Sequence, residues 1–164
     1  MGTERWFLKI DGIPGDSTDA VHKEEIDVQA WSWGGSNSGS SGPGGGSGGG
    51  AGKVNFQDFQ FVSRISRATP KLFLSCATGT HYKEATLSGV RSVGKGKGND
   101  LLKYKLRDVT VSSFQHGDSA DGNPTDSFSL TFSKVDVSYF PQSATGKVEP
   151  PISAGYDLKA NKKI

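Results

Sequence analysis

The chain has 164 residues, which suffices for one domain with a buried core and is too short for two ordinary domains. Its formal net charge is only +2, with Lys and Arg interspersed among Asp and Glu, so we expect neither nucleic acid nor an anionic membrane as a partner. Cys76 is the single cysteine, which excludes an intrachain disulfide and fits folding in a reducing cytosol. The charged N-terminal segment contains no apolar run for a signal peptide or membrane helix, so any export is expected to follow a signal-independent route.

Alternating apolar and polar residues predict strands along most of the chain. These segments are 6–10, 26–33, 54–61, 82–90, 101–114, 128–140 and 156–158, with Gly, Asp, Asn and Pro clustered between them. Seven strands in one domain spanning 1–164 favour a mainly β fold, either a sandwich or a barrel.

In three of the longer segments the apolar residues change partway along from even-numbered to odd-numbered positions. From residue 128 the apolar positions are even up to Phe132 and odd from Val135, and similar shifts occur in 54–61 and 101–114. Because side chains alternate with a period of two, each shift needs a bulge, a sharp bend, or a strand whose halves bury opposite faces. Strands that wrap between two sheets of a small closed barrel meet this requirement. The alternative is that some shifts mark short loops within the segments.

One short helix is predicted at about 70–78. Thr69 is suited to cap its N-terminus, Pro70 to the first helical position, and Gly79 to a left-handed closing residue. Its predicted apolar face, which would pack on the barrel wall, consists of Leu72, Phe73, Cys76 and Ala77. Cys76 is interpreted as a small core residue and not as a reactive thiol.

The segment 34–52 contains 16 Gly or Ser among its 19 residues. Ordering it would cost roughly 1 to 2 kcal/mol per residue in backbone entropy, without apolar burial as compensation. We therefore expect a flexible loop in the isolated subunit, with a reach of roughly 25 Å, long enough to touch a neighbouring molecule. The alternative is a tolerated insertion in a hairpin.

Two segments partly match catalytic motifs, but each lacks neighbouring residues that its motif requires. The segment 45–49 formally satisfies GxSxG, but glycines flank it where a nucleophile elbow needs a strand and a helix. Lys53 follows Gly52 as in a phosphate-binding loop, yet Val54 occupies the position of the magnesium-binding hydroxyl. No enzyme class is therefore indicated.

Candidate ligand-binding groups are equally sparse. His22, His81 and His116 lie far apart without ligand spacing, so neither a metal nor another cofactor is expected. The acidic and amide residues Asp118, Asp121, Asn123 and Asp126 lack EF-hand spacing and are interpreted as a solvated turn. The alternating cations Lys103, Lys105 and Arg107 are interpreted as the wet face of a sheet, with polyanion binding as the alternative.

Many short motifs, in order and spacing, resemble one family. They are KIDGIPGD at 9–16, HKEEIDVQAWSWG at 22–34, GAGKV at 50–54, FQDF at 56–59, Thr69-Pro70, LTF at 130–132 with Val135 and Val137, Tyr139, Pro141, Gln142, and GYDL at 155–158. Over essentially the whole chain, this pattern resembles the haemolysin-coregulated protein (Hcp) family, the tube subunits of bacterial type VI secretion.

The resemblance implies a closed β-barrel of two sheets with a flanking helix and no catalysis or cofactor. It further implies that six copies form a ring and that rings stack into a tube, which a contractile sheath propels into another cell. A spike protein would cap the tube, small effectors would bind in the lumen, and the subunit itself would be secreted from the bacterium. The chain stops shortly after the last strand, so no toxin extension is expected.

The resemblance also assigns site residues. The expected inter-ring loop consists of Gly34, Gly35, Ser36, Asn37, Ser38, Gly39, Ser40, Ser41, Gly42, Pro43, Gly44, Gly45, Gly46, Ser47, Gly48, Gly49, Gly50, Ala51 and Gly52. Ser32, between two tryptophans, is expected to face the lumen and contact cargo. The expected core residues are Trp31, Trp33, Phe73, Leu130 and Phe132. The competing hypothesis is a monomeric β-barrel module that binds carbohydrate or another small ligand under a glycine-rich lid.

Overall fold

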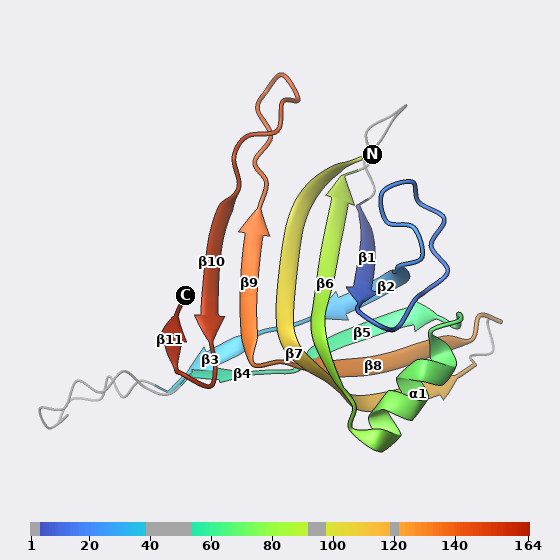
Figure 1. The fold of residues 1–164 in the computed structure, drawn as a ribbon. Helices are drawn as coiled ribbons and strands as arrows, with labels where there is room; N and C mark the ends of the chain where they lie inside the picture. Colours follow the sequence, from blue (N-terminus) through green and yellow to red (C-terminus); the bar gives the residue numbers. More distant parts are fainter. Residues whose placement is uncertain (1–3, 39–53, 92–97, 119–121) are drawn as a thin grey trace, which may run out of the picture.

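The computed structural model describes residues 4–38, 54–91, 98–118 and 122–164 (Figure 1). Within these ranges the helix is α1 (Thr69–Thr78). The strands are β1 (Arg5–Ile10), β2 (Ile26–Ser32), β3 (Gly35–Asn37), β4 (Val54–Phe56), β5 (Phe59–Arg64), β6 (His81–Arg91), β7 (Asn99–Gly117), β8 (Thr125–Thr131), β9 (Lys134–Tyr139), β10 (Ile152–Asp157) and β11 (Lys162–Lys163). No helix in these ranges has the length and apolar character needed to cross a membrane.

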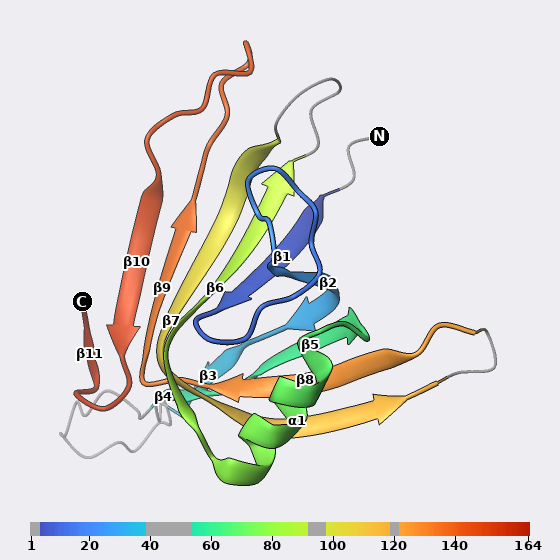
Figure 2. The ribbon, with the colours of Figure 1, turned by 45° about the vertical axis from the view of Figure 1, so that its right-hand side comes forward.

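Six antiparallel strands close into a barrel in the order β7, β6, β1, β2, β5, β8, and β8 pairs back with β7. The closure depends on β7, which is 19 residues long. Its first half pairs with β6 and β9, and its second half pairs with β8. Figures 1 and 2 show that β7 thereby passes from the upright layer into the layer of β5 and β8. The predicted mainly β barrel with two layers and one flanking helix is confirmed.

The three predicted phase shifts have different structural causes. In β7, Leu106 and Val109 are both buried because Asp108 between them adopts a left-handed φ of 55°. This residue bends the strand without interrupting it. The other two shifts mark breaks, at 57–58 between β4 and β5 and at 132–133 between β8 and β9. Both alternatives from the sequence, the bend and the short loop, therefore occur.

Two groups of strands flank the barrel outside its closure. On the free side of the first half of β7, strands β9, β10 and β11 extend the sheet, and we call these three strands the wing. Strands β3 and β4 form a separate two-stranded sheet, which we call the ribbon. Figure 1 shows the wing beside β7 and the ribbon at its lower end. The sequence predicted neither β3 nor β11, because such short polar segments carry little periodicity.

The helix starts one residue earlier than predicted. Thr69 is its first residue, and no side chain caps the preceding Ala68. The Thr69 hydroxyl instead accepts a hydrogen bond from the Ser66 N–H at 3.0 Å and donates one to Asp126 at 2.5 Å. Gly79 closes the helix with a φ of 65°, as expected. The predicted N-cap role of Thr69 is thus wrong, and its hydroxyl ties the helix start to β8.

The predicted apolar face of the helix needs a correction. Leu72 and Ser75 are buried, whereas 58% of Phe73 is exposed. Successive helical residues point about 100° apart, so a helix that packs with the Leu72 side on the barrel turns Phe73 outward. The prediction of Phe73 as a core residue is therefore wrong. Cys76 is a free, half-buried thiol.

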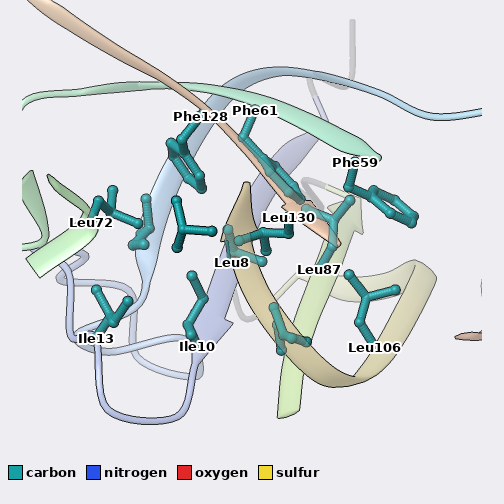
Figure 3. Packing of buried hydrophobic residues seen from close by; sticks show 14 of the residues in the cluster. Leu8, Ile10, Ile13, Phe59, Phe61, Leu72, Leu87, Leu106, Phe128 and Leu130 are labelled. Carbon is teal, nitrogen blue, oxygen red and sulfur yellow. The ribbon is translucent and has the colours of Figure 1, made fainter. Parts of the chain in front are cut away.

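The core fills the barrel between its two layers (Figure 3). Its fully buried large side chains include Leu8, Ile13, Ile26, Phe59, Phe61, Leu72, Leu87, Leu106, Val109, Phe128 and Leu130. Leu130 thus lies in the core, whereas Trp31, Trp33 and Phe132 are half-buried and pack against its edge.

Candidate assembly surfaces

An aromatic cluster joins the barrel to the ribbon and the wing. Trp33 stacks on Phe59 with ring centroids 4.8 Å apart, and on Phe56 of the ribbon at 5.1 Å. Phe56 meets Tyr156 of the wing edge-to-face at 5.8 Å. Tyr104 of β7 completes the cluster at 5.7 Å from Trp33, and burial raises the pKa of its phenol. Because such pairs add to the energy of apolar burial, this cluster holds the ribbon against the wing.

The ribbon brings the two ends of the glycine-rich segment together. Gly35 pairs with Phe56, Asn37 pairs with Val54, and the Gln57 N–H donates to Gly34 at 2.9 Å. At Gly35 any Cβ would lie 2.6 Å from the Phe56 ring, so only glycine allows this close approach. Residues 39–52 of the predicted inter-ring loop lie outside the described part of the chain.

Ser32 lies on the opposite side of β2 from the core. It is exposed, and it pairs with Gln60 of β5. Its neighbours Trp31 and Trp33 are half-buried and turned toward the aromatic cluster. The alternation of β2 thus presents Ser32 on the outer surface of the barrel wall.

The lysine face of β7 is balanced by carboxylates. Lys105 lies 3.5 Å from Glu84 of β6, and Lys103 lies 3.4 Å from Asp100. Opposite charges in such pairs cancel the local field, so this arrangement favours the interpretation as a wet sheet face over polyanion binding.

The bend of β7 is surrounded by charged partners. The Asp108 carboxylate accepts hydrogen bonds from Lys159 and from the His81 ring, both at 3.0 Å. Both bonds lower the pKa of Asp108, and the bond from Lys159 has the larger effect. Among the described residues, no group of three or more His, Cys, Asp or Glu side chains is arranged to hold a metal.

A buried carboxylate was missed by the sequence interpretation. Asp126 is fully buried in β8, where it accepts hydrogen bonds from Thr69 and from the His116 ring, the latter at 2.9 Å. Its assignment to a solvated turn is therefore wrong. Its position directly before the alternating strand that begins at Phe128 was the available signal, because Asp126 continues the same even, inward phase.

Comparisons with known proteins agree with this architecture. Residues 7–139 match the family described as "Type VI secretion system effector, Hcp". The chain is 43% identical over 157 residues to Protein hcp1 of Pseudomonas aeruginosa, covering 94% of this chain and 95% of that protein. A crystal structure of Hcp1 from Salmonella typhimurium shares 34% identity and a TM-score of 0.77, covering 98% of this chain and 99% of that one. Another solved structure, a type six secretion system protein, reaches a TM-score of 0.90 at 27% identity, covering 99% and 100% of the two chains. Sequence, barrel topology and extent agree, and the chain belongs to the Hcp family of type VI secretion proteins.

Proposed function

We propose that this chain is a structural subunit of the type VI secretion tube and assembles into rings of six copies. Membership of the Hcp family, over nearly the full length of the relatives, is the observation that carries this proposal. In this role the chain is a single domain that functions by assembling with other copies. It catalyses no reaction and uses no cofactor.

The mass of the purified protein tests the ring. Sedimentation equilibrium should give about six times the 17.3 kDa of one chain. A mass of one chain, unchanged over a wide range of concentration, would instead support the monomeric ligand-binding module and refute the ring.

We further propose that the segment 34–52 contacts the adjacent ring when rings stack. The ribbon supports this role because it holds both ends of the segment at one site on the subunit. Deleting 40–49 should leave single rings intact and reduce tube length in electron micrographs. A shorter deletion in another surface loop, 143–147, is the control. Tubes of normal length after the first deletion would remove this role.

Ser32 is the proposed contact for small effectors in the ring lumen. Its exposure on the outer face of β2 supports this role, because a cargo contact must be accessible. Ser32→Gln should weaken effector binding in co-purification without changing the mass of the ring, whereas Gln60→Ala on the neighbouring strand is the matched control. Unchanged effector recovery with Ser32→Gln would refute the assignment.

The remaining proposed partners are a spike protein that caps the tube and a contractile sheath around it. The subunit is then proposed to begin in the bacterial cytoplasm and to leave the cell with the tube, without an N-terminal signal. Immunoblots of culture medium should detect the protein from cells with a sheath and not from cells without one. Equal release from both strains would contradict this route.

A further inference from the structure

Residues 11–25 connect β1 to β2, and the second half of this connection packs on the outer face of β1. Leu8 lies in the barrel core, so alternation places Phe7 on the opposite face of the strand. Phe7 is nevertheless fully buried, and the imidazole of His22 stacks on its ring at a centroid distance of 4.7 Å and an interplanar angle of 9°. Figures 1 and 2 show the connection as a long loop beside β1. We call residues 18–25 the cover loop.

The cover loop has few buried contacts besides that of His22. Within 18–25, all of which the structure describes, His22 is the only buried residue, whereas the first half of the connection places Ile13 in the barrel core. A hollow of about 460 Å³ is lined by Lys9 of β1 and by Val21 and Glu25 of the cover loop. Segments with few buried contacts open locally at a low free-energy cost. The contacts of His22 therefore decide how firmly the cover loop is held.

Two carboxylates face the two ring nitrogens of His22. Its Nδ1 atom lies 3.0 and 3.1 Å from the two carboxylate oxygens of Glu25. Its Nε2 atom is buried and has no hydrogen-bond partner among the described residues. The Asp100 carboxylate, at the start of β7, lies 3.9 Å from Nε2. One carboxylate thus comes from the cover loop and the other from the barrel.

The protonated imidazole satisfies both nitrogens, and the neutral one does not. A neutral imidazole carries one proton, so a hydrogen bond from Nδ1 to Glu25 leaves an unpaired acceptor at Nε2, facing the Asp100 carboxylate. The imidazolium donates from both nitrogens. A charged N–H···O bond spans about 2.7 to 2.9 Å, so the Asp100 side chain, which is 34% exposed, has to move by about 1 Å to accept it.

Carboxylates outnumber cations around His22 among the described residues. They are Asp19 and Glu25 of the cover loop, Asp27 of β2 and Asp100 of β7, against Arg5 of β1 and Lys103 of β7. Asp19 accepts a hydrogen bond from the His22 backbone N–H at 3.0 Å, and it lies 3.4 Å from Arg5. Lys103 lies 3.4 Å from Asp100. An imidazolium therefore reduces an excess of negative charge, whereas a neutral ring leaves it.

We propose that His22 is a pH-sensitive switch that controls the cover loop. When protonated, His22 bridges Glu25 and Asp100 and holds the loop closed over Phe7. After His22 loses the proton, the loop opens more often and uncovers Phe7. The closed loop binds the proton more tightly than the open loop, so closure is favoured at low pH and weakens as the pH rises through the titration of His22. The switch belongs to a single chain and does not depend on the proposed ring.

Amide hydrogen exchange of the cover loop tests the switch. Exchange is measured on the whole protein at about pH 5.5 and about pH 8, on either side of the ordinary histidine titration, and is corrected for the pH dependence of unprotected amides. Protection of 18–25, relative to that of β5 and β8, should be about tenfold greater at the lower pH, as expected for a proton affinity that differs about tenfold between the closed and the open loop. Equal relative protection at both pH values would overturn the proposal.

Three substitutions separate His22 from other causes of pH dependence. His22→Gln should remove the difference between the two pH values and leave the loop weakly protected at both. Asp100→Asn should reduce the difference, and because it keeps His22 in place it tests the switch even if His22→Gln unfolds the barrel. His81→Gln is the matched control, since the His81 side chain also lies beside a carboxylate, that of Asp108, but is 70% exposed. A full difference in His22→Gln or in Asp100→Asn, or its loss in His81→Gln, would refute the assignment to His22.

Discussion

The aromatic cluster makes a quantitative prediction about Phe59. This side chain is fully buried, and its ring lies within 6.3 Å of those of Trp31, Trp33 and Tyr104. Phe59→Ala removes the transfer energy of the ring and leaves a cavity, which together cost about 3 to 5 kcal/mol in well-packed cores. Several aromatic contacts disappear with it, so we expect about 4 kcal/mol or more. A domain of this kind has a total stability of about 5 to 15 kcal/mol, so the variant should fold but unfold at much lower denaturant.

The assay is guanidinium chloride unfolding followed by tryptophan fluorescence, at several protein concentrations because association adds to the apparent stability. Gln60→Ala, the next and exposed residue of the same strand, is the control and should change the free energy of unfolding by less than about 0.5 kcal/mol. Phe59→Leu should fall between the two. A loss below about 1 kcal/mol for Phe59→Ala would refute the cluster as the joint between barrel and ribbon.

Three further changes test individual packing and charge contacts. Gly89→Ala places a Cβ 2.4 Å from the Trp6 ring, so it should cost about 1 to 3 kcal/mol in denaturant unfolding; an unchanged midpoint would show that Trp6 moves freely. Asp126→Asn leaves a buried hydrogen-bonded site half satisfied and should cost about 1 to 3 kcal/mol in the same assay, whereas a neutral effect would contradict the buried network. The backbone N–H of Ala160 is the main cause that lowers the pKa of Asp157 below 3.8, so its stabilisation is present above that pH and is lost as the pH falls through the folded pKa. Asp157→Asn should therefore lower Tm at about pH 7 but hardly at about pH 2, and an equal loss at both values would exclude the charge as its cause.

Much of the barrel could be predicted from local pattern. The alternation in β1, β2, β6 and β8 reports directly which face is buried, and the phase shift near Asp108 indicated that β7 changes its surroundings. Gly79 marked the helix end because only a residue without a Cβ adopts that conformation easily. These features depend on neighbours within a few residues, which a sequence displays.

The sequence could not show which segments meet over long distances. Phe73 has the same helical environment in sequence as Leu72, and only the packing of α1 on the barrel distinguishes them. Asp126 continues the inward phase of β8, but the sequence does not show its hydrogen-bond partners, of which Thr69 is 57 residues away in the chain. The wing was predicted only in part: β9 lies within the predicted segment 128–140, whereas β10 was predicted only from Tyr156, although its apolar alternation begins at Ile152.

The length of β7 explains how one chain combines a closed barrel with an open extension of its sheet. At 19 residues it greatly exceeds the usual strand, which has about 3 to 10 residues. Its second half uses β8 to close the barrel, and a closed barrel has no strand edge to offer. The first half of β7, which precedes the bend at Asp108, pairs on the same side with β9 instead. The sheet then continues from β9 to the open edge of β10. The bend in β7 therefore divides its sheet into two parts, a closed barrel and an extension that ends in the open edge of β10.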